Sequence, residues 1–83
     1  MRLSIIIVNY KTSQLVINCL ASIYKYDVTN VEIFLVDNNS GDNIQFILEQ
    51  NYPQVIFIQM GYNAGFARAN NAAIKIADQK SVV

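Results

Sequence analysis

The chain has 83 residues, of which 53% are hydrophobic and 14% charged, and its six Lys and Arg residues balance six Asp and Glu. This composition excludes intrinsic disorder, allows one small domain, and lacks the positive charge that a nucleic-acid partner requires. There is no histidine, and a single cysteine, Cys19, excludes a disulfide-stapled secreted protein. The apolar runs are too short for a membrane span or a signal peptide, so we expect a soluble, cytoplasmic chain.

The first apolar run, residues 3–8, is nearly continuous, which indicates a strand covered on both faces in a parallel sheet. Thr12 or Ser13 can cap the helix that follows. The buried face of this helix is predicted from helical spacing to comprise Val16, Cys19, Leu20 and Ile23. Cys19 is therefore expected to be inert core packing.

A second buried strand is predicted at residues 31–36, and it runs into the turn cluster of residues 37–41. Asp42 then lies where a helix cap is needed, and Pro53 follows the end of the second helix. The apolar stripe of this helix comprises Ile44, Ile47 and Leu48.

The third strand is predicted at residues 55–58, followed by a loop at 61–65 and an alanine-rich helix from about Ala64 to Asp78. Val82 and Val83 resemble the start of a fourth strand. The βαβαβα order predicts an α/β fold, a three-layer Rossmann-like parallel sheet, because helical crossovers join the strands. Right-handed crossovers give the spatial strand order 3-2-1.

In such a sheet, ligands bind outside the carboxyl ends of the strands. Polar residues and glycines follow the predicted strands at this edge: Asn9, Tyr10, Asp37, Asn38, Asn39, Gly41, Gly61, Asn63 and Gly65. Two interpretations of Asp37 stay open. Its carboxylate can accept a hydrogen bond from the imide N–H of uracil or thymine, or from ribose hydroxyls. Alternatively, it caps the turn at residues 38–41, because Asp and Asn bond their own backbone in turns.

Asn70 and Asn71 are unusual inside a helix, where asparagine costs roughly 0.5 kcal/mol relative to alanine. The predicted core face of this helix comprises Phe66, Asn70, Ala73 and Ala77. Because a buried amide needs partners, Asn70 either bonds a neighbouring loop or shapes a ligand site near the helix start.

Three further side chains have two interpretations each. Tyr10 either stacks on a nucleobase or packs against the protein. Arg68 and Lys11 either reach a diphosphate or are solvated. A dinucleotide fingerprint, a P-loop, Cys/His metal spacing, a serine hydrolase elbow and an Asp-x-Asp pair are all missing from the sequence.

Three segments match a known pattern in order: residues 3–12, Val36-Asp37-Asn38-Asn39-Ser40, and Asn63-Ala64-Gly65-Phe66-Ala67-Arg68-Ala69-Asn70-Asn71. Together they resemble the start of a family 2 inverting glycosyltransferase of the GT-A fold, similar to the bacterial rhamnosyltransferase-like members. The resemblance covers nearly the whole chain.

The resemblance implies that the chain is the nucleotide-sugar-binding part of such an enzyme. The implied nucleotide-binding residues are Asn9, Tyr10, Asp37, Asn39, Gly65 and Asn70. Asp37 matches the aspartate that recognises the base, Gly65 and the adjoining helix start would lie close to the nucleotide, and Asn70 would support that wall. Arg68 lies outside the signature positions and is a candidate phosphate contact.

The family's Asp-x-Asp-like motif, which holds Mg²⁺ or Mn²⁺ against the sugar diphosphate, follows a fourth strand that would begin near Val82. We therefore expect residues 1–83 to be a truncated domain with neither metal ligands nor catalytic residues. The intact enzyme would transfer a sugar from a UDP- or dTDP-linked donor to a glycan or lipid-linked acceptor, in the cytoplasm or at the inner face of the membrane. The 83-residue chain alone is predicted to be inactive, because neither a metal nor a base is supplied.

Two alternatives remain. One is a non-catalytic nucleotide-binding or assembly module, in which residues 5–8 lie at an open sheet edge and drive self-association. The other is a flavodoxin-like regulator, which the segment from Asn63 to Asn71 disfavours.

Overall fold

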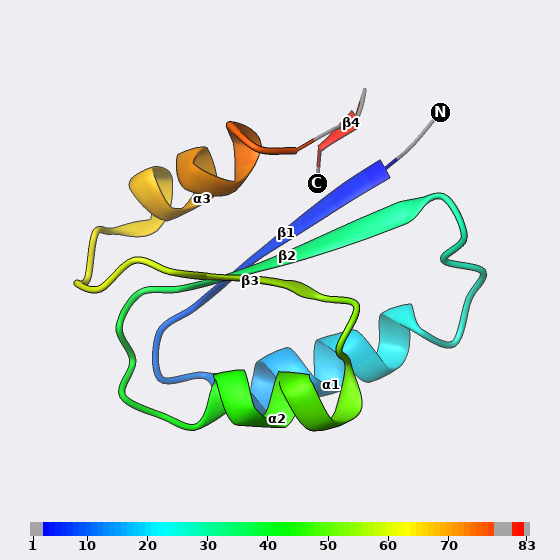
Figure 1. Ribbon diagram of the computed structural model, residues 1–83, viewed down its shortest axis with the longest axis horizontal. Coiled ribbons are helices and arrows are strands. Elements are labelled where there is room, and N and C mark those ends of the chain that lie inside the picture. The colour runs from blue at the N-terminus through cyan, green and yellow to red at the C-terminus, as the bar shows by residue number, and fades with distance from the viewer. Residues whose placement is uncertain (1–2, 78–80, 83) are drawn as a thin grey trace.

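In the part of the chain that the structure describes, residues 3–77 and 81–82, a computed structural model shows four strands and three helices (Figure 1). The strands are β1 (Leu3–Asn9), β2 (Val31–Asp37), β3 (Ile56–Gln59) and β4 (Ser81–Val82). The helices are α1 (Ser13–Ile23), α2 (Ile44–Asn51) and α3 (Phe66–Ile74).

All paired strands are parallel, and their order is β3-β2-β1-β4. The predicted order 3-2-1 is confirmed. The sequence also predicted an open edge at residues 5–8 of β1. Pairing with β4 covers only the start of the strand, and among the described residues no strand pairs with that side of residues 5–8. Ser81 and Val82 form β4 and pair with Leu3 and Ser4, so the first two residues of β1 have strand partners on both sides. Val83 lies outside the described residues.

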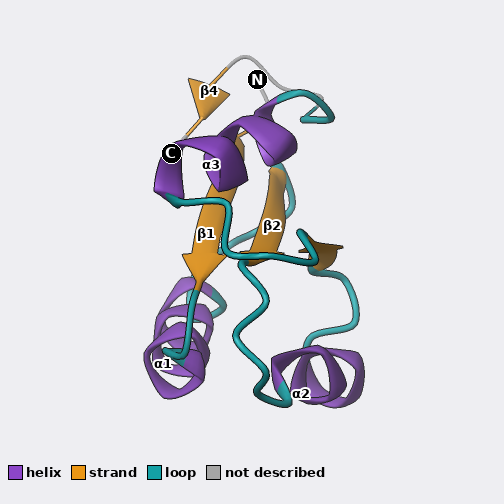
Figure 2. Cartoon of the chain, turned by 90° about the vertical axis from the view of Figure 1, so that its left-hand side faces the viewer, coloured by secondary structure: helices purple, strands orange, loops and turns teal. Residues whose placement is uncertain are grey.

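Helix α3 lies on one side of the sheet, and α1 and α2 lie on the other (Figure 2). The sheet thus divides two apolar clusters, as expected for strands covered on both faces. The cluster beneath α1 and α2 comprises Val16, Leu20, Ile33, Leu35, Ile44, Leu48 and Val55. The cluster beneath α3 comprises Phe34, Val36, Ala69 and Ala73. Successive β2 side chains enter opposite clusters because the side chains of a strand alternate between the two faces of the sheet.

Cys19 is exposed, so the prediction that it packs in the core is wrong. The buried residues of α1 are Val16 and Leu20, one turn apart. Neighbouring helix residues are about 100° apart around the axis, which turns Cys19 away from the stripe that Leu20 defines.

The core face of α3 is also displaced from its predicted position. Ala69 and Ala73 are fully buried, whereas Phe66 is 72% exposed and Asn70 is only half-buried. Small alanine side chains let α3 lie close to Phe34 and Val36 of the sheet, and the larger residues are left outside this contact.

The third helix differs from its predicted bounds. It was predicted from about Ala64 to Asp78, but α3 spans Phe66–Ile74, and Asp78 lies outside the described residues. Among residues 3–77 and 81–82, none of the helices combines the length and apolar character that crossing a bilayer requires.

Candidate functional site

The polar residues that end β1, β2 and β3 form a row across the sheet. Asn9 pairs in register with Asp37, which in turn pairs with Gln59. Each of the three lies two positions after a strand residue that packs beneath α1 and α2. Because side chains two positions apart in a strand lie on the same face, all three leave the sheet on the face that α1 and α2 cover. In Figure 1 the loops that follow these strands lie at the left-hand end of the sheet, and Figure 2 looks onto that end.

Asp37 is the centre of this row. The residue is 2% exposed. Oδ1 accepts hydrogen bonds from Asn9 Nδ2 at 2.9 Å and from the Ser40 hydroxyl. Oδ2 accepts from Gln59 Nε2 at 3.0 Å and from the Ser40 backbone N–H at 3.3 Å. These donors replace the water that the carboxylate loses on burial. The bond from the Ser40 amide confirms that Asp37 caps its turn, and its contact with a base stays a prediction.

Asn9 holds the row to the two neighbouring loops. It is fully buried, and its Nδ2 also donates to Ser40 Oγ at 2.9 Å and to Asp42 Oδ2 at 3.3 Å. Its Oδ1 accepts from the backbone N–H of Thr12 at 3.2 Å and from Thr12 Oγ1 at 2.9 Å. Asn9 therefore joins Thr12, Asp37, Ser40 and Asp42 into one hydrogen-bonded group, here called the rim. The side chain of Asn9 is enclosed, and its backbone carbonyl accepts the Asn38 N–H. Its implied contact with a nucleotide, through the backbone, stays a prediction.

The helix caps differ slightly from their predicted form. Thr12 is the N-cap residue of α1, but its side chain makes no capping bond because its hydroxyl donates to Asn9. Asn43 is the N-cap residue of α2, while Asp42 Oδ1 accepts the Ile44 N–H at 3.3 Å. Asp42 thus satisfies one backbone amide at the start of α2, which is the role predicted for it. It lies one residue before the N-cap residue, Asn43.

Tyr10 and Lys11 continue the chain outward from Asn9. Tyr10 is 41% exposed, so it is not simply packed, and Lys11 Nζ lies 5.2 Å from the centroid of its ring. Lys11 adopts a left-handed backbone conformation, with φ of 57°. The Lys11 ammonium therefore lies over one face of the partly exposed Tyr10 ring at the end of β1.

The turn after β2 contains two asparagines with different roles. Asn39 is exposed and left-handed, with φ of 61°, which asparagine tolerates better than most residues. Asn38 is buried, and its Nδ2 donates to the Gly65 carbonyl at 3.3 Å while its Oδ1 accepts the Ala64 N–H at 3.3 Å. Asn38 therefore ties the β2–α2 loop to the start of α3.

The remaining predicted residues lie at α3. Gly65 is its N-cap residue, with φ 82° and ψ 165°, and its N–H donates to Asn63 Oδ1 at 3.3 Å. Arg68 is exposed and lines a cavity of about 410 Å³ with Met60 and Lys75. Asn70 lies one turn beyond Phe66, half-buried at the margin of the core. Hydrogen bonds from Asn38 thus connect the start of α3, at Gly65, with the turn that follows Asp37. Asn70 takes no part in the hydrogen bonds that link the described residues around Asn9 and Asp37.

Sequence reasoning missed Gln59 and passed over the side chain of Asn38. The signal for Gln59 was its place as the last residue of a strand, like Asn9 and Asp37. The third strand was predicted at residues 55–58, one residue short of its observed end, and Gln59 was placed neither in that strand nor in the loop at 61–65.

The row is unsuited to a divalent cation. The N–H groups of Asn9 face both Asp37 and Asp42, at 2.9 and 3.3 Å, and a cation between these carboxylates would meet those donors. Among residues 3–77 and 81–82, no group of three His, Cys, Asp or Glu side chains is placed to hold a metal.

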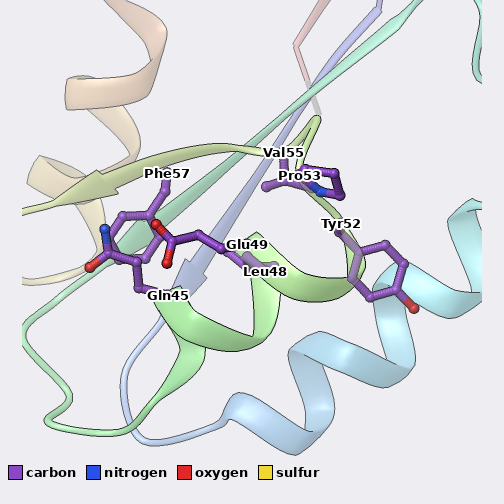
Figure 3. A pocket seen from close by; sticks show the side chains of 7 residues that line it. All are labelled: Gln45, Leu48, Glu49, Tyr52, Pro53, Val55 and Phe57. Carbon is purple, nitrogen blue, oxygen red and sulfur yellow. The ribbon is translucent and has the colours of Figure 1, made fainter.

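A separate cavity of about 280 Å³ lies between α2 and β3 (Figure 3). Its lining comprises Gln45, Leu48, Glu49, Tyr52, Pro53, Val55 and Phe57. Tyr52 also stacks on Tyr24, with ring centroids 5.4 Å apart. No residue of the predicted site lines this cavity, and it is not part of the rim.

Comparison with known proteins identifies the architecture. The model of glycosyl transferase family 2 matches residues 4–83. The chain is 32% identical over 76 residues to the chondroitin synthase of Escherichia coli, which covers 88% of this chain and 11% of that protein. It therefore spans about a tenth of the length of this relative.

Two solved structures share the fold. The mannosyltransferase PcManGT from Pyrobaculum calidifontis, in complex with GDP-Man and Mn²⁺, superposes with a TM-score of 0.80 at 24% identity, over 93% of this chain and 24% of its own. TarS of S. aureus, residues 1–349, superposes with a TM-score of 0.85 at 26% identity, over 100% of this chain and 27% of its own. The predicted Rossmann-like sheet of a GT-A fold is confirmed.

Proposed function

Because the chain belongs to glycosyl transferase family 2, we propose that the carboxyl edge of its sheet binds the nucleotide of a nucleotide-sugar donor. The observation that carries this proposal is the position of Asp37, a buried carboxylate at the end of the interior strand β2. Ligands of open parallel sheets bind at this edge. The complex of the mannosyltransferase with GDP-Man supports a nucleotide-sugar as the ligand class.

Asp37 accepts the imide N–H of the base, which favours a UDP- or dTDP-linked donor. The exposed ring of Tyr10, which follows Asn9 at the same edge, stacks on that base. Asn39 borders the ligand from the turn after β2, and Gly65 brings the backbone at the start of α3 close to the nucleotide. Asn70 supports this wall of the site from the margin of the core.

The transfer itself belongs to a longer protein in this proposal, with a sugar moved with inversion to a glycan or lipid-linked acceptor. The chondroitin synthase relative supports a role in polysaccharide synthesis. Mn²⁺ accompanies GDP-Man in the mannosyltransferase, and a metal of this kind would neutralise the leaving diphosphate. Since the Asp37 row does not suit a cation, we expect the purified 83-residue chain to turn over no nucleotide-sugar above a no-protein control.

Calorimetry with UDP, dTDP and CDP tests the nucleotide site. We expect UDP and dTDP to bind more tightly than CDP, because the N3 position of cytosine carries no N–H for Asp37. Asp37→Asn keeps the size of the side chain but removes its charge. It should weaken UDP binding about tenfold or more, the value of a hydrogen bond to a charged group.

The matched control is Asp27→Asn, which neutralises a fully exposed carboxylate in the loop that leads into β2, at the opposite edge of the sheet. Its UDP affinity should equal that of the natural chain. Circular dichroism establishes that both variants are folded. Equal binding of UDP and CDP, or an Asp37→Asn variant that binds UDP normally, would contradict the role assigned to Asp37.

A second function, self-association, is favoured by the short pairing of β4 with β1. Among the described residues, β4 pairs with Leu3 and Ser4, and no strand pairs with that side of residues 5–9. An unpaired strand edge is a template for pairing with another chain. Light scattering should then detect dimers or larger species at high concentration, and a monomer under all conditions refutes this function.

A further inference from the structure

The carboxylate of Asp37 is saturated before any ligand arrives. An ionised carboxylate offers about four lone-pair positions to hydrogen-bond donors. Four donors from within the chain already bond Asp37: Asn9 Nδ2, Ser40 Oγ, Ser40 N and Gln59 Nε2. A nucleobase N–H that reaches this carboxylate therefore has to take the place of one of them.

The four donors differ in how easily they can leave. Asn9 is fully buried and bonded to two loops, and Ser40 is 7% exposed with its hydroxyl also facing Asp42 Oδ1 at 3.2 Å. Gln59 is exposed and ends the short strand β3, which has β2 on one side and, among the described residues, no strand on the other. Its side chain can rotate into solvent without opening the core.

Resting on the nucleotide site proposed above, we infer that Gln59 is the exchangeable partner of Asp37. In the free chain the Gln59 amide occupies Asp37 Oδ2. When the nucleotide binds, the base imide N–H takes this position and the Gln59 amide moves away. Gln59 is thus a positioning residue that covers the base-recognising carboxylate until a ligand with a suitable donor replaces it.

The backbone contact of Gln59 keeps this cover in place. Gln59 Oε1 accepts the Gly61 N–H at 2.9 Å, which orients the Nε2 end of the amide toward Asp37. The cover therefore competes with the ligand, and its removal should strengthen binding.

The test combines one substitution with one spectroscopic measurement. Gln59→Met keeps the length of the side chain but has no N–H donor. We expect its UDP affinity, measured by calorimetry, to rise about three- to tenfold, the net value of one hydrogen bond that no longer has to be broken. Gln45→Met, at an exposed glutamine of α2, is the matched control and should bind UDP like the natural chain.

NMR follows the exchange in the natural chain. The side-chain amide signals of Gln59 in a ¹⁵N spectrum should shift with UDP at the same midpoint as the backbone signals, while those of Gln45 stay constant. N3-methyl-UDP, which lacks the imide N–H, should leave the Gln59 signals in their free positions. If the Gln59 side-chain signals do not shift when UDP binds, the proposed exchange is wrong.

The outcomes separate the two proposals. UDP binding that depends on Asp37 but is equal or weaker in Gln59→Met overturns the role of Gln59 alone. A natural chain that binds no UDP overturns the nucleotide site and, with it, the exchange.

Discussion

Asn9 and Asp37 face each other at the last paired position of β1 and β2, and the Asn9 amide donates to Asp37 Oδ1 over 2.9 Å. These residues are 28 positions apart in the chain. Their bond joins two strand ends and, through Thr12 and Ser40, the loops that lead into α1 and α2. The rim is therefore a buried polar network, in which each member depends on the others.

Asn9→Ala should destabilise the chain by about 1–3 kcal/mol, because buried groups around Asp37 lose their partner. Urea unfolding measures the change. Asn18→Ala removes an exposed α1 side chain that accepts a hydrogen bond from Gln14 across the helix surface. It should change stability by about 0.5 kcal/mol or less. Equal effects of the two substitutions would show that the network contributes no stability.

Asn38→Ala should release the start of α3 from the turn after β2. The substitution removes both side-chain bonds to the backbone of Ala64 and Gly65, so the amide of Ala64 becomes free to open. Hydrogen exchange at Ala64 should accelerate more than exchange in the centre of β2. Asn43→Ala is the control, since Asn43 is exposed and makes no side-chain capping bond. Unchanged protection of Ala64 in Asn38→Ala would contradict the coupling of the two loops.

Gly65→Ala should cost about 1–3 kcal/mol of stability, because φ 82° with ψ 165° is a backbone region that is essentially restricted to glycine. The cost comes from the backbone alone, since no atom outside residues 64–66 lies within 4 Å of a Cβ built at this position. Ala67→Ser, at an exposed position in the first turn of α3, is the control. If thermal unfolding lowers the melting temperature of both variants by the same amount, the backbone at Gly65 accommodates alanine without strain.

The stability of the chain should fall in alkaline solution through Tyr24. Burial raises the pKa of its hydroxyl above the ordinary value of 10.0, partly offset by a hydrogen bond with Gln54. The folded chain thus holds this proton more tightly than the unfolded chain. The contribution of Tyr24 is complete below the unfolded pKa and is lost as the pH rises through the folded pKa.

Urea unfolding at about pH 8 and about pH 11, on either side of the tyrosine pKa, measures this loss. Tyr24→Phe cannot ionise, so its stability should fall less between the two pH values than that of the natural chain. Tyr26→Phe, at a 77% exposed tyrosine, should behave like the natural chain. A parallel decline of all three would assign the alkaline loss to other groups.

The edge at which the site lies could be predicted from the sequence, because continuous apolar strands joined by helices can form only a sheet covered on both faces. The position of Asp37 at the end of β2 followed directly from that pattern. Single positions on helix faces could not be predicted in the same way. Cys19 is exposed, and Ala69 rather than Asn70 enters the core, because small differences in helix rotation and side-chain volume are resolved only when the layers pack.

The sequence by itself determined the element order, the parallel sheet and the edge that gathers polar residues, since all three depend on local periodicity and on the handedness of crossovers. The tertiary structure alone decided which side chains bond to one another at that edge. Asn9 and Gln59 reach Asp37 from positions 28 and 22 residues away. The pairing of such distant residues is set by strand register and not by local sequence.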